Sequence, residues 1–229
     1  MNILFTVVFG FHANLPTRYG PPVMKQNSDT LTIQGNSLRT WSYYSPGIEN
    51  AQISLSTEGR PLNAEVELWN GPDNTPFKMR IYLENGKMSP FNTVVEMPYN
   101  PNTISIKNSG TIELPIIANI ITDFVDKPSD KSLTSLASIQ GGAIRTYTIN
   151  PNIENVEILV KTDGCPLNSR IELLQGPENN KQVVEFYTED GFSRPFFCIL
   201  NTENVESVIR IINTSPVTFP LKASVVPVI

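Results

Sequence analysis

The chain has 229 residues with 17 Lys and Arg against 22 Asp and Glu, so its formal net charge is −5, and only 17% of its residues are charged. This acidic balance, with no basic cluster, argues against nucleic acid as the main partner, because phosphate backbones are bound by concentrated Lys and Arg. The single histidine, His12, and the two cysteines argue against a His-rich metal site, a Ser-His-Asp triad and a multi-cysteine zinc site. The composition therefore predicts no catalytic residue, no metal and no cofactor.

Residues 1–30 form an N-terminal arm that has no counterpart elsewhere in the sequence. The arm begins with a short apolar run, Ile3–Phe11, and no Lys or Arg occurs before Arg18. The run is shorter than the ~20 apolar residues that a membrane-spanning helix needs, and a secretory signal would start with a positive charge. We interpret it as an arm that packs on a domain or on a neighbouring subunit, with a signal peptide or a residual targeting segment as the alternatives. No membrane span is predicted.

Residues 31–121 contain short alternating runs separated by Gly, Pro and Asn. Apolar residues spaced two apart, such as Ile53 and Leu55, are typical of half-buried strands. No stretch of a dozen residues has a helical period without a Pro or Gly inside it. The runs predict an antiparallel β-sandwich of seven strands, with a partly open barrel as the alternative: Leu38–Tyr44, Ala51–Thr57, Ala64–Trp69, Lys78–Leu83, Phe91–Met97, Thr103–Lys107 and Leu114–Ile121.

Residues 122–134 are polar and contain Pro128, which predicts a linker, and residues 135–229 then repeat the first half. The run Ile33-Gln34-Gly35 returns as Ile139-Gln140-Gly141, and Ile48–Ile120 aligns without a gap with Ile153–Val225. About a third of those aligned positions are identical, and most of the matches are turn residues. The sequence therefore predicts an all-β chain of two tandem homologous antiparallel β-sandwich domains of about seven strands each, at 31–121 and 135–229.

The candidates for chemistry are few. Glu65 and Glu67 lie on one strand face, but the matching pair in the second repeat is Arg170 and Glu172. A solvated strand face is therefore favoured over a catalytic dyad. The cysteines, Cys165 and Cys198, belong to different elements and no CxxC occurs, so we expect free thiols.

The candidate assembly interface combines two strands and the C-terminus. Arg39 precedes Trp41 by two residues, as Arg145 precedes Tyr147, and an Arg beside an aromatic residue is typical either of interface hot spots or of an Arg stem packed on a sheet. The apolar C-terminus is expected to dock on a neighbouring subunit or on the first domain, through Val225, Val226, Val228 and Ile229. Two similar domains would give the subunit a pseudo-two-fold axis, and open sheet edges would offer unpaired backbone groups to neighbours.

Aromatic residues leave a second function open. A non-catalytic binding module, with carbohydrate as the candidate ligand, would place aromatic rings along one face of a sandwich. The available rings are Trp69, Tyr43, Tyr44, Tyr82 and Tyr99, of which at least half are expected in the core.

Several long strings in the first repeat resemble the diatom pyrenoid shell proteins: Ser37–Ser42, Thr57–Ala64, Glu65–Pro76, Lys78–Tyr82, Glu84–Gly86 and Pro90-Phe91. The resemblance covers about residues 35–228, more loosely in the second repeat. It implies a structural protein, not an enzyme, that self-assembles into a lattice around the Rubisco condensate of an algal chloroplast and supports carbon concentration. The implied partners are further copies of the chain, with Rubisco or the pyrenoid matrix as candidates, and the implied location is the stroma at the pyrenoid periphery. Residues 1–30 are too short and too poor in Ser and Arg for a complete bipartite plastid signal, so delivery to the plastid is implied by the family alone.

Overall fold

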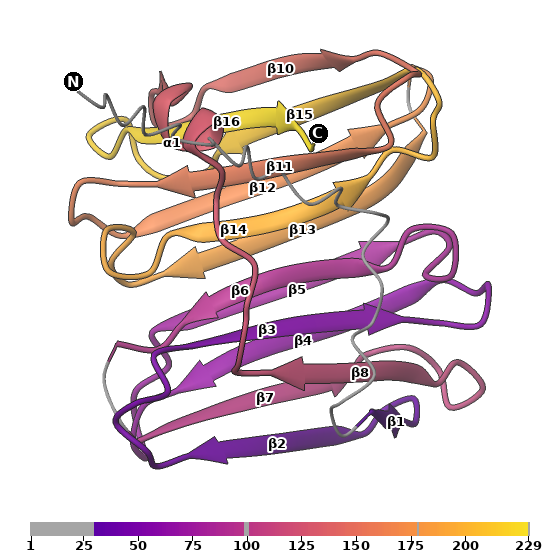
Figure 1. The fold of residues 1–229 in the computed structure, drawn as a ribbon, viewed down its shortest axis with the longest axis vertical. Coiled ribbons are helices and arrows are strands. Elements are labelled where there is room, and N and C mark those ends of the chain that lie inside the picture. Colours follow the sequence, from indigo (N-terminus) through magenta and orange to yellow (C-terminus); the bar gives the residue numbers. More distant parts are fainter. Residues whose placement is uncertain (1–29, 99–100, 178, 229) are drawn as a thin grey trace, which may run out of the picture.

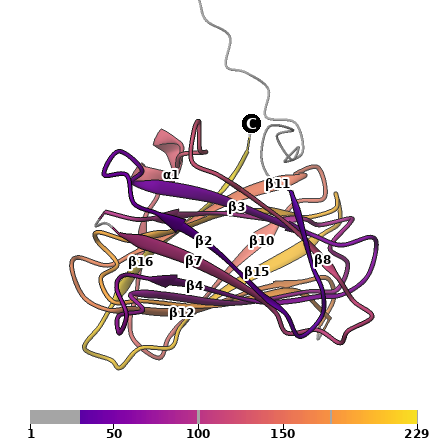
Figure 2. The same cartoon turned by 90° about the horizontal axis from the view of Figure 1, so that it is seen from below.

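The computed structural model describes residues 30–98, 101–177 and 179–228, which form two antiparallel sheets packed face to face (Figures 1 and 2). The first repeat supplies eight strands: β1 (Leu31–Ile33), β2 (Leu38–Tyr43), β3 (Asn50–Ser56), β4 (Leu62–Trp69), β5 (Phe77–Leu83), β6 (Phe91–Glu96), β7 (Asn102–Asn108) and β8 (Ile116–Ile121). The second repeat supplies eight more: β9 (Ala137–Ile139), β10 (Ile144–Ile149), β11 (Asn155–Lys161), β12 (Leu167–Leu174), β13 (Asn180–Thr188), β14 (Phe196–Asn201), β15 (Ser207–Asn213) and β16 (Leu221–Pro227).

The predicted all-β class and antiparallel sandwich are confirmed. Each of the seven predicted runs is a strand, with ends shifted by one or two residues. The prediction missed the three-residue strands β1 and β9 and the short helix α1 (Asp130–Thr134), because such short elements carry too few positions to show a period. No helix among residues 30–98, 101–177 and 179–228 is long and apolar enough to cross a membrane.

Each sheet contains strands from both repeats. Sheet A has the order β1-β8-β3-β6-β14-β11-β16-β9, and sheet B has the order β10-β15-β12-β13-β5-β4-β7-β2. Both orders are palindromic with respect to the repeat, because β1 corresponds to β9, β2 to β10 and so on to β8 and β16. The two repeats are therefore related by a pseudo-two-fold axis that passes through the middle of both sheets.

The register at the two central junctions locates this axis. In sheet B, β5 pairs with β13 and Arg80 lies opposite Glu185, its own equivalent 105 positions later. In sheet A, β6 pairs with β14 and Thr93 lies opposite Cys198, again its own equivalent. The axis thus passes between Arg80 and Glu185 in sheet B and between Thr93 and Cys198 in sheet A. The junction resembles a two-fold dimer interface built into one chain.

The buried core is continuous across this junction. One cluster of buried apolar side chains includes residues of both repeats, and Phe186 of β13 stacks on Phe196 of β14 with ring centroids 3.8 Å apart. The predicted split of the chain into two separate sandwich domains is not confirmed by this arrangement, because both sheets and the main core run through the middle of the molecule. The domain boundaries at 31–121 and 135–229 stay a prediction.

The linker crosses the outer face of sheet A (Figure 1). Its Asp126 accepts a hydrogen bond of 2.6 Å from the Gln52 amide of β3, and Ser129 donates through its hydroxyl to Glu157 of β11 at 2.6 Å. Beneath it lies a second small apolar cluster that joins the repeats, made of Val94, Leu159, Phe197 and Ile199 with Val125, Leu136 and Val228 packed against it. The linker therefore fastens the outer face of sheet A across the pseudo-two-fold axis.

Candidate assembly interface

Sheet B ends in β2 on one side and β10 on the other, at opposite ends of the long axis of the molecule (Figure 1). Four of the eight predicted interface residues lie on these edge strands. Arg39 and Arg145 are exposed, whereas Trp41 and Tyr147 are half-buried and pack against the main core. The structure therefore places the two Arg–aromatic pairs at equivalent positions on the two ends of the subunit.

The tyrosines of the two edge strands are neutral, and one of them contacts an arginine. The Arg145 guanidinium carbon lies 5.7 Å from the centre of the Tyr147 ring, within the range of a cation–π contact. Burial raises the pKa of the Tyr147 phenol above its ordinary value, against the smaller opposing effect of Arg145, and it raises the pKa of Tyr43 to about 12. Both phenols stay protonated at neutral pH, so their rings can pack against cations without a competing phenolate.

Alternate backbone groups of both edge strands point away from the sheet. The Asn108 N–H donates to the Ser37 carbonyl at 2.9 Å, and the Asn213 N–H donates to the Ala143 carbonyl at 3.0 Å. Because N–H and C=O groups alternate in direction along a strand, the groups that point outward are the next ones and every second one after them. These belong to Leu38, Thr40 and Ser42 in β2 and to Ile144, Thr146 and Thr148 in β10; within the described ranges no other strand pairs with them.

Sequence reasoning did not single out these six residues. The signal was present in the recurrence of Leu38-Arg39-Thr40-Trp41-Ser42 as Ile144-Arg145-Thr146-Tyr147-Thr148. In each run, an apolar residue and two hydroxyl-bearing residues alternate with the Arg and the aromatic residue. Only the sheet order shows that both runs are edges.

The C-terminal segment lies inside sheet A. β16 pairs with β11 on one side, where Val225 lies opposite Ile158 and Val226 opposite Glu157, and with β9 on the other. Val226 is 3% exposed, and Val228 packs on the small cluster beneath the linker. Val225 and Val226 therefore belong to a strand of sheet A that pairs with strands of its own repeat and is not docked on the first repeat, while a contact of this segment with a neighbouring subunit stays a prediction. Ile229 and the arm of residues 1–29 lie outside the described residues.

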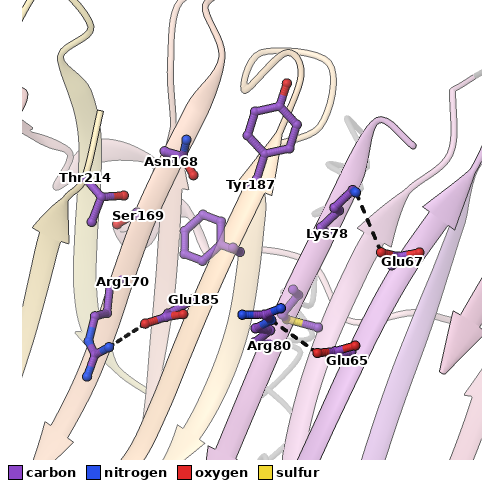
Figure 3. A pocket seen from close by; sticks show the side chains of 12 residues that line it. Glu65, Glu67, Lys78, Arg80, Asn168, Ser169, Arg170, Glu185, Tyr187 and Thr214 are labelled. Atoms are coloured by element: carbon purple, nitrogen blue, oxygen red, sulfur yellow. Dashed lines mark hydrogen bonds and ion pairs between the residues drawn. The ribbon is translucent and has the colours of Figure 1, made fainter. Parts of the chain in front are cut away.

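The outer face of sheet B carries an open depression of about 510 Å³ over the pseudo-two-fold axis (Figure 3). Glu65 forms ion pairs with Arg80 at 3.3 Å and with Lys107 at 3.6 Å, and Glu67 forms one with Lys78 at 3.8 Å. Each glutamate is thus paired with a cation from a neighbouring strand. This pairing supports the interpretation of Glu65 and Glu67 as a solvated strand face.

The second half of this face pairs two glutamates with two arginines. Arg170 donates to Glu172 at 2.7 Å and to Glu185, and Glu172 also lies 3.1 Å from Arg210. Burial alone would lower the pKa of Arg170, but its hydrogen bonds to the Glu172 and Glu185 carboxylates and their negative charges together raise it above its ordinary value. A ligand in the depression would have to displace ion pairs that already satisfy one another, so the arrangement favours a rigid structural surface.

The two cysteines are free thiols, as expected. Burial raises the pKa of Cys198 far above the usual value of a thiol, so it carries no reactive thiolate. Within the part of the chain that the structure describes, no three His, Cys, Asp or Glu side chains gather into a possible metal site.

The aromatic residues considered for carbohydrate binding do not form one platform. Tyr43 packs against the main core, and the Trp69 indole donates to Glu67 at 2.8 Å. Tyr44 is 77% exposed in the loop after β2, whereas Tyr82 belongs to β5, three strands from β2 in sheet B, and Tyr99 lies outside the described residues.

Comparison with known proteins identifies the chain's relatives. A search of curated proteins found no match to this sequence. A family model described as diatom pyrenoid shell protein matches residues 24–227, which include all sixteen strands and the linker. The match spans both repeats as one unit, in agreement with the continuous sheets. The chain therefore belongs to the diatom pyrenoid shell protein family.

Proposed function

We propose that this protein is a non-catalytic structural subunit that associates with copies of itself into a sheet around the Rubisco condensate of the chloroplast. Membership of the family indicates a pyrenoid shell protein. In this proposal the sheet lies in the stroma at the pyrenoid periphery, shapes the condensate and supports carbon concentration. Rubisco or the pyrenoid matrix would be in contact with one of its faces.

The observation that carries the proposal is the palindromic strand order. It places two open edges, β2 and β10, at opposite ends of one subunit. A body with related but separate contact surfaces at its two ends associates without closing, and such contacts propagate into extended assemblies. The ion-paired outer face of sheet B agrees with a role in contact, because Glu65, Glu67, Glu172 and Glu185 are all held by cations of this face.

Electron microscopy of the purified chain tests the proposal. Negative-stain images at neutral pH should show sheets or tubes, because the two edges stay available in every added subunit. Dispersed particles of subunit size at all protein concentrations would contradict self-association. A glycan array run on the same preparation examines the carbohydrate-binding alternative, and the shell proposal expects no bound glycan.

A further inference from the structure

We propose that β2 of one subunit pairs in an antiparallel sense with β10 of a second copy, with Thr40 opposite Thr146 of the partner subunit. Sheet B would then continue from subunit to subunit. This inference rests on the proposed self-association and adds to it the strands, their direction and their register.

The direction follows from the number of strands in sheet B. Its eight strands alternate in direction, so the two edges β2 and β10 run opposite to each other, as the arrows of Figure 1 show. A second copy displaced along the long axis, without any rotation, therefore presents its β10 antiparallel to β2. After each addition, one β2 edge and one β10 edge stay free at the two ends of the row. A row of subunits can therefore grow indefinitely.

The junction inside the chain is the precedent for this contact. There a strand of the first repeat meets a strand of the second, and β5 pairs with β13 over seven residue pairs. Pairing of β2 with β10 keeps the same alternation of first and second repeats and needs one type of contact. Pairing of like with like, β2 on β2 and β10 on β10, would need two types.

The register follows from the same symmetry and from the outward backbone groups. At the internal junction Arg80 faces its equivalent Glu185, and in the repeat alignment Thr40 corresponds to Thr146. With Thr40 opposite Thr146 of the partner subunit, the outward groups of Leu38 and Ser42 also meet outward groups of the partner's β10. The two six-residue strands then overlap over five residue pairs, and every outward N–H and C=O of β2 finds a partner.

The side chains fit this register. Arg39 would lie opposite Tyr147 of the partner subunit, and Trp41 opposite Arg145 of the partner subunit. Both are cation–aromatic pairs at the closer, non-hydrogen-bonded positions of the ladder, where cross-strand side chains interact most. The contact would also cover Leu38, which is 42% exposed, and Ile144, which is 57% exposed.

The edges of sheet B lack the usual protection against such pairing. Neither β2 nor β10 contains Pro or Lys, whereas the edges of sheet A are β1 and β9, which have only three residues each. Proteins that stay monomeric commonly shorten their edges or place Pro and Lys on them. Sheet B therefore offers the pairing edge, and sheet A has the shortened one.

Two proline variants test the pairing. Thr40→Pro and Thr146→Pro each remove an outward N–H that makes no bond within the subunit, so the fold should tolerate them at the edge. Each variant alone should form no assemblies of subunits, because the same edge strand is blocked in every subunit. In an equimolar mixture, Thr40→Pro supplies an intact β10 and Thr146→Pro an intact β2, so sedimentation should show pairs of subunits that the separate variants do not form.

A cross-link gives a second measurement in case the prolines disturb the fold. In a Cys165→Ser background, Arg39→Cys and Tyr147→Cys would face each other at about 4.5 Å between Cα atoms, a separation that a disulfide can bridge. Oxidation should link the two variants when they are mixed and should link neither alone. The buried Cys198 is unreactive in both.

The outcomes separate this inference from the proposed function. If the wild-type chain forms no assembly, the proposed function fails. If the wild type and both proline variants form the same sheets and no cross-link appears on mixing, the inference is overturned while the function stands. Dimers of Thr40→Pro alone, or a cross-link within one cysteine variant alone, would show pairing of like strands and would also overturn it.

Discussion

Two buried asparagines explain why the ends of the repeats are so alike. Asn108 and Asn213 are fully buried and occupy equivalent positions. The Asn213 side chain donates to the carbonyls of Ile139 at 3.0 Å and Phe219 at 2.9 Å, and its carbonyl oxygen accepts from the Ser215 N–H at 3.0 Å. One amide thus ties β9 to the turn before β16 and satisfies three backbone groups.

Asn213→Asp should destabilise the protein strongly. The change keeps the shape of the side chain but removes the two N–H donors and places a carboxylate beside two carbonyl oxygens. Since each unsatisfied buried group costs about 1–3 kcal/mol, the free energy of unfolding should fall by at least about 2 kcal/mol in urea denaturation. Asn179→Asp, at an exposed position, is the matched control and should change it little. Equal effects of the two substitutions would refute this role.

The burial of Asn213 also explains why its glycosylation-like sequence, Asn213-Thr214-Ser215, cannot be modified in the folded chain.

The glycines of the recurring Ile-Gln-Gly run have a related role. A Cβ on Gly35 would lie 1.8 Å from the Thr111 carbonyl oxygen, and a Cβ on Gly141 would lie 1.9 Å from that of Pro216. The turn into each edge strand of sheet B therefore passes directly against a neighbouring turn. Their recurrence predicted turn residues, but the reason for the recurrence is a contact between segments far apart in the chain.

At the scale of the strands, the local sequence pattern predicted the long strands but not which strands they pair with. Half-buried strands such as β4, where buried and half-exposed residues alternate from Leu62 to Trp69, show a clear period of two. The fully buried β14 shows none, and it was predicted only through the alignment of the second repeat with the first. The predicted assembly interface stays a prediction: Arg39 and Trp41 lie on an edge strand, whereas the apolar run at the C-terminus pairs with β11 of its own repeat, because an apolar run by itself does not reveal what covers it.

The inner position of β16 leads to a prediction for its valines. Val226→Ala should lower the free energy of unfolding by about 2 kcal/mol, because it removes two buried carbon atoms and leaves a small void. Val217→Ala is a matched control, since Val217 is 74% exposed in a turn and the same truncation there should be nearly neutral. Thermal or urea unfolding of the two variants measures the difference. A neutral Val226→Ala would show that β16 contributes little to the monomer and would restore the idea of a segment free to dock elsewhere.

The whole molecule is one sandwich assembled from two copies of a smaller one. Nothing in the sequence of β5 or β13 shows that they pair with each other, because that pairing depends on which edges remain open after each repeat has folded. The same is true of β6 and β14. The union of the repeats is therefore a property of the sheets and could not be predicted from local pattern, whereas the duplication itself was evident from the alignment.

The internal junction should re-form between separated halves. A chain cut between Lys127 and Pro128 leaves the Asp126–Gln52 contact with the first half and the Ser129–Glu157 contact with the second. Each half then exposes two inner strands as edges, and the halves should associate one to one when mixed. Pairing of like halves would place Arg80 opposite Arg80, or Glu185 opposite Glu185, and like charges directly opposite on a ladder are destabilising.

Charge substitutions at the axis measure this preference. Glu185→Arg in the second half should weaken its complex with the first half several-fold, because it places two arginines directly opposite each other on the ladder, where like charges are destabilising. Arg80→Glu in the first half should restore the affinity for that variant. Titration calorimetry of the four combinations gives the coupling between the two positions directly. If the four affinities are equal, or if each half forms like pairs as readily as mixed ones, the charges at the axis do not direct the union of the repeats. A positive coupling would mean that the change of one residue in the duplicated strand, from Arg80 to Glu185, favours joining unlike repeats over like ones.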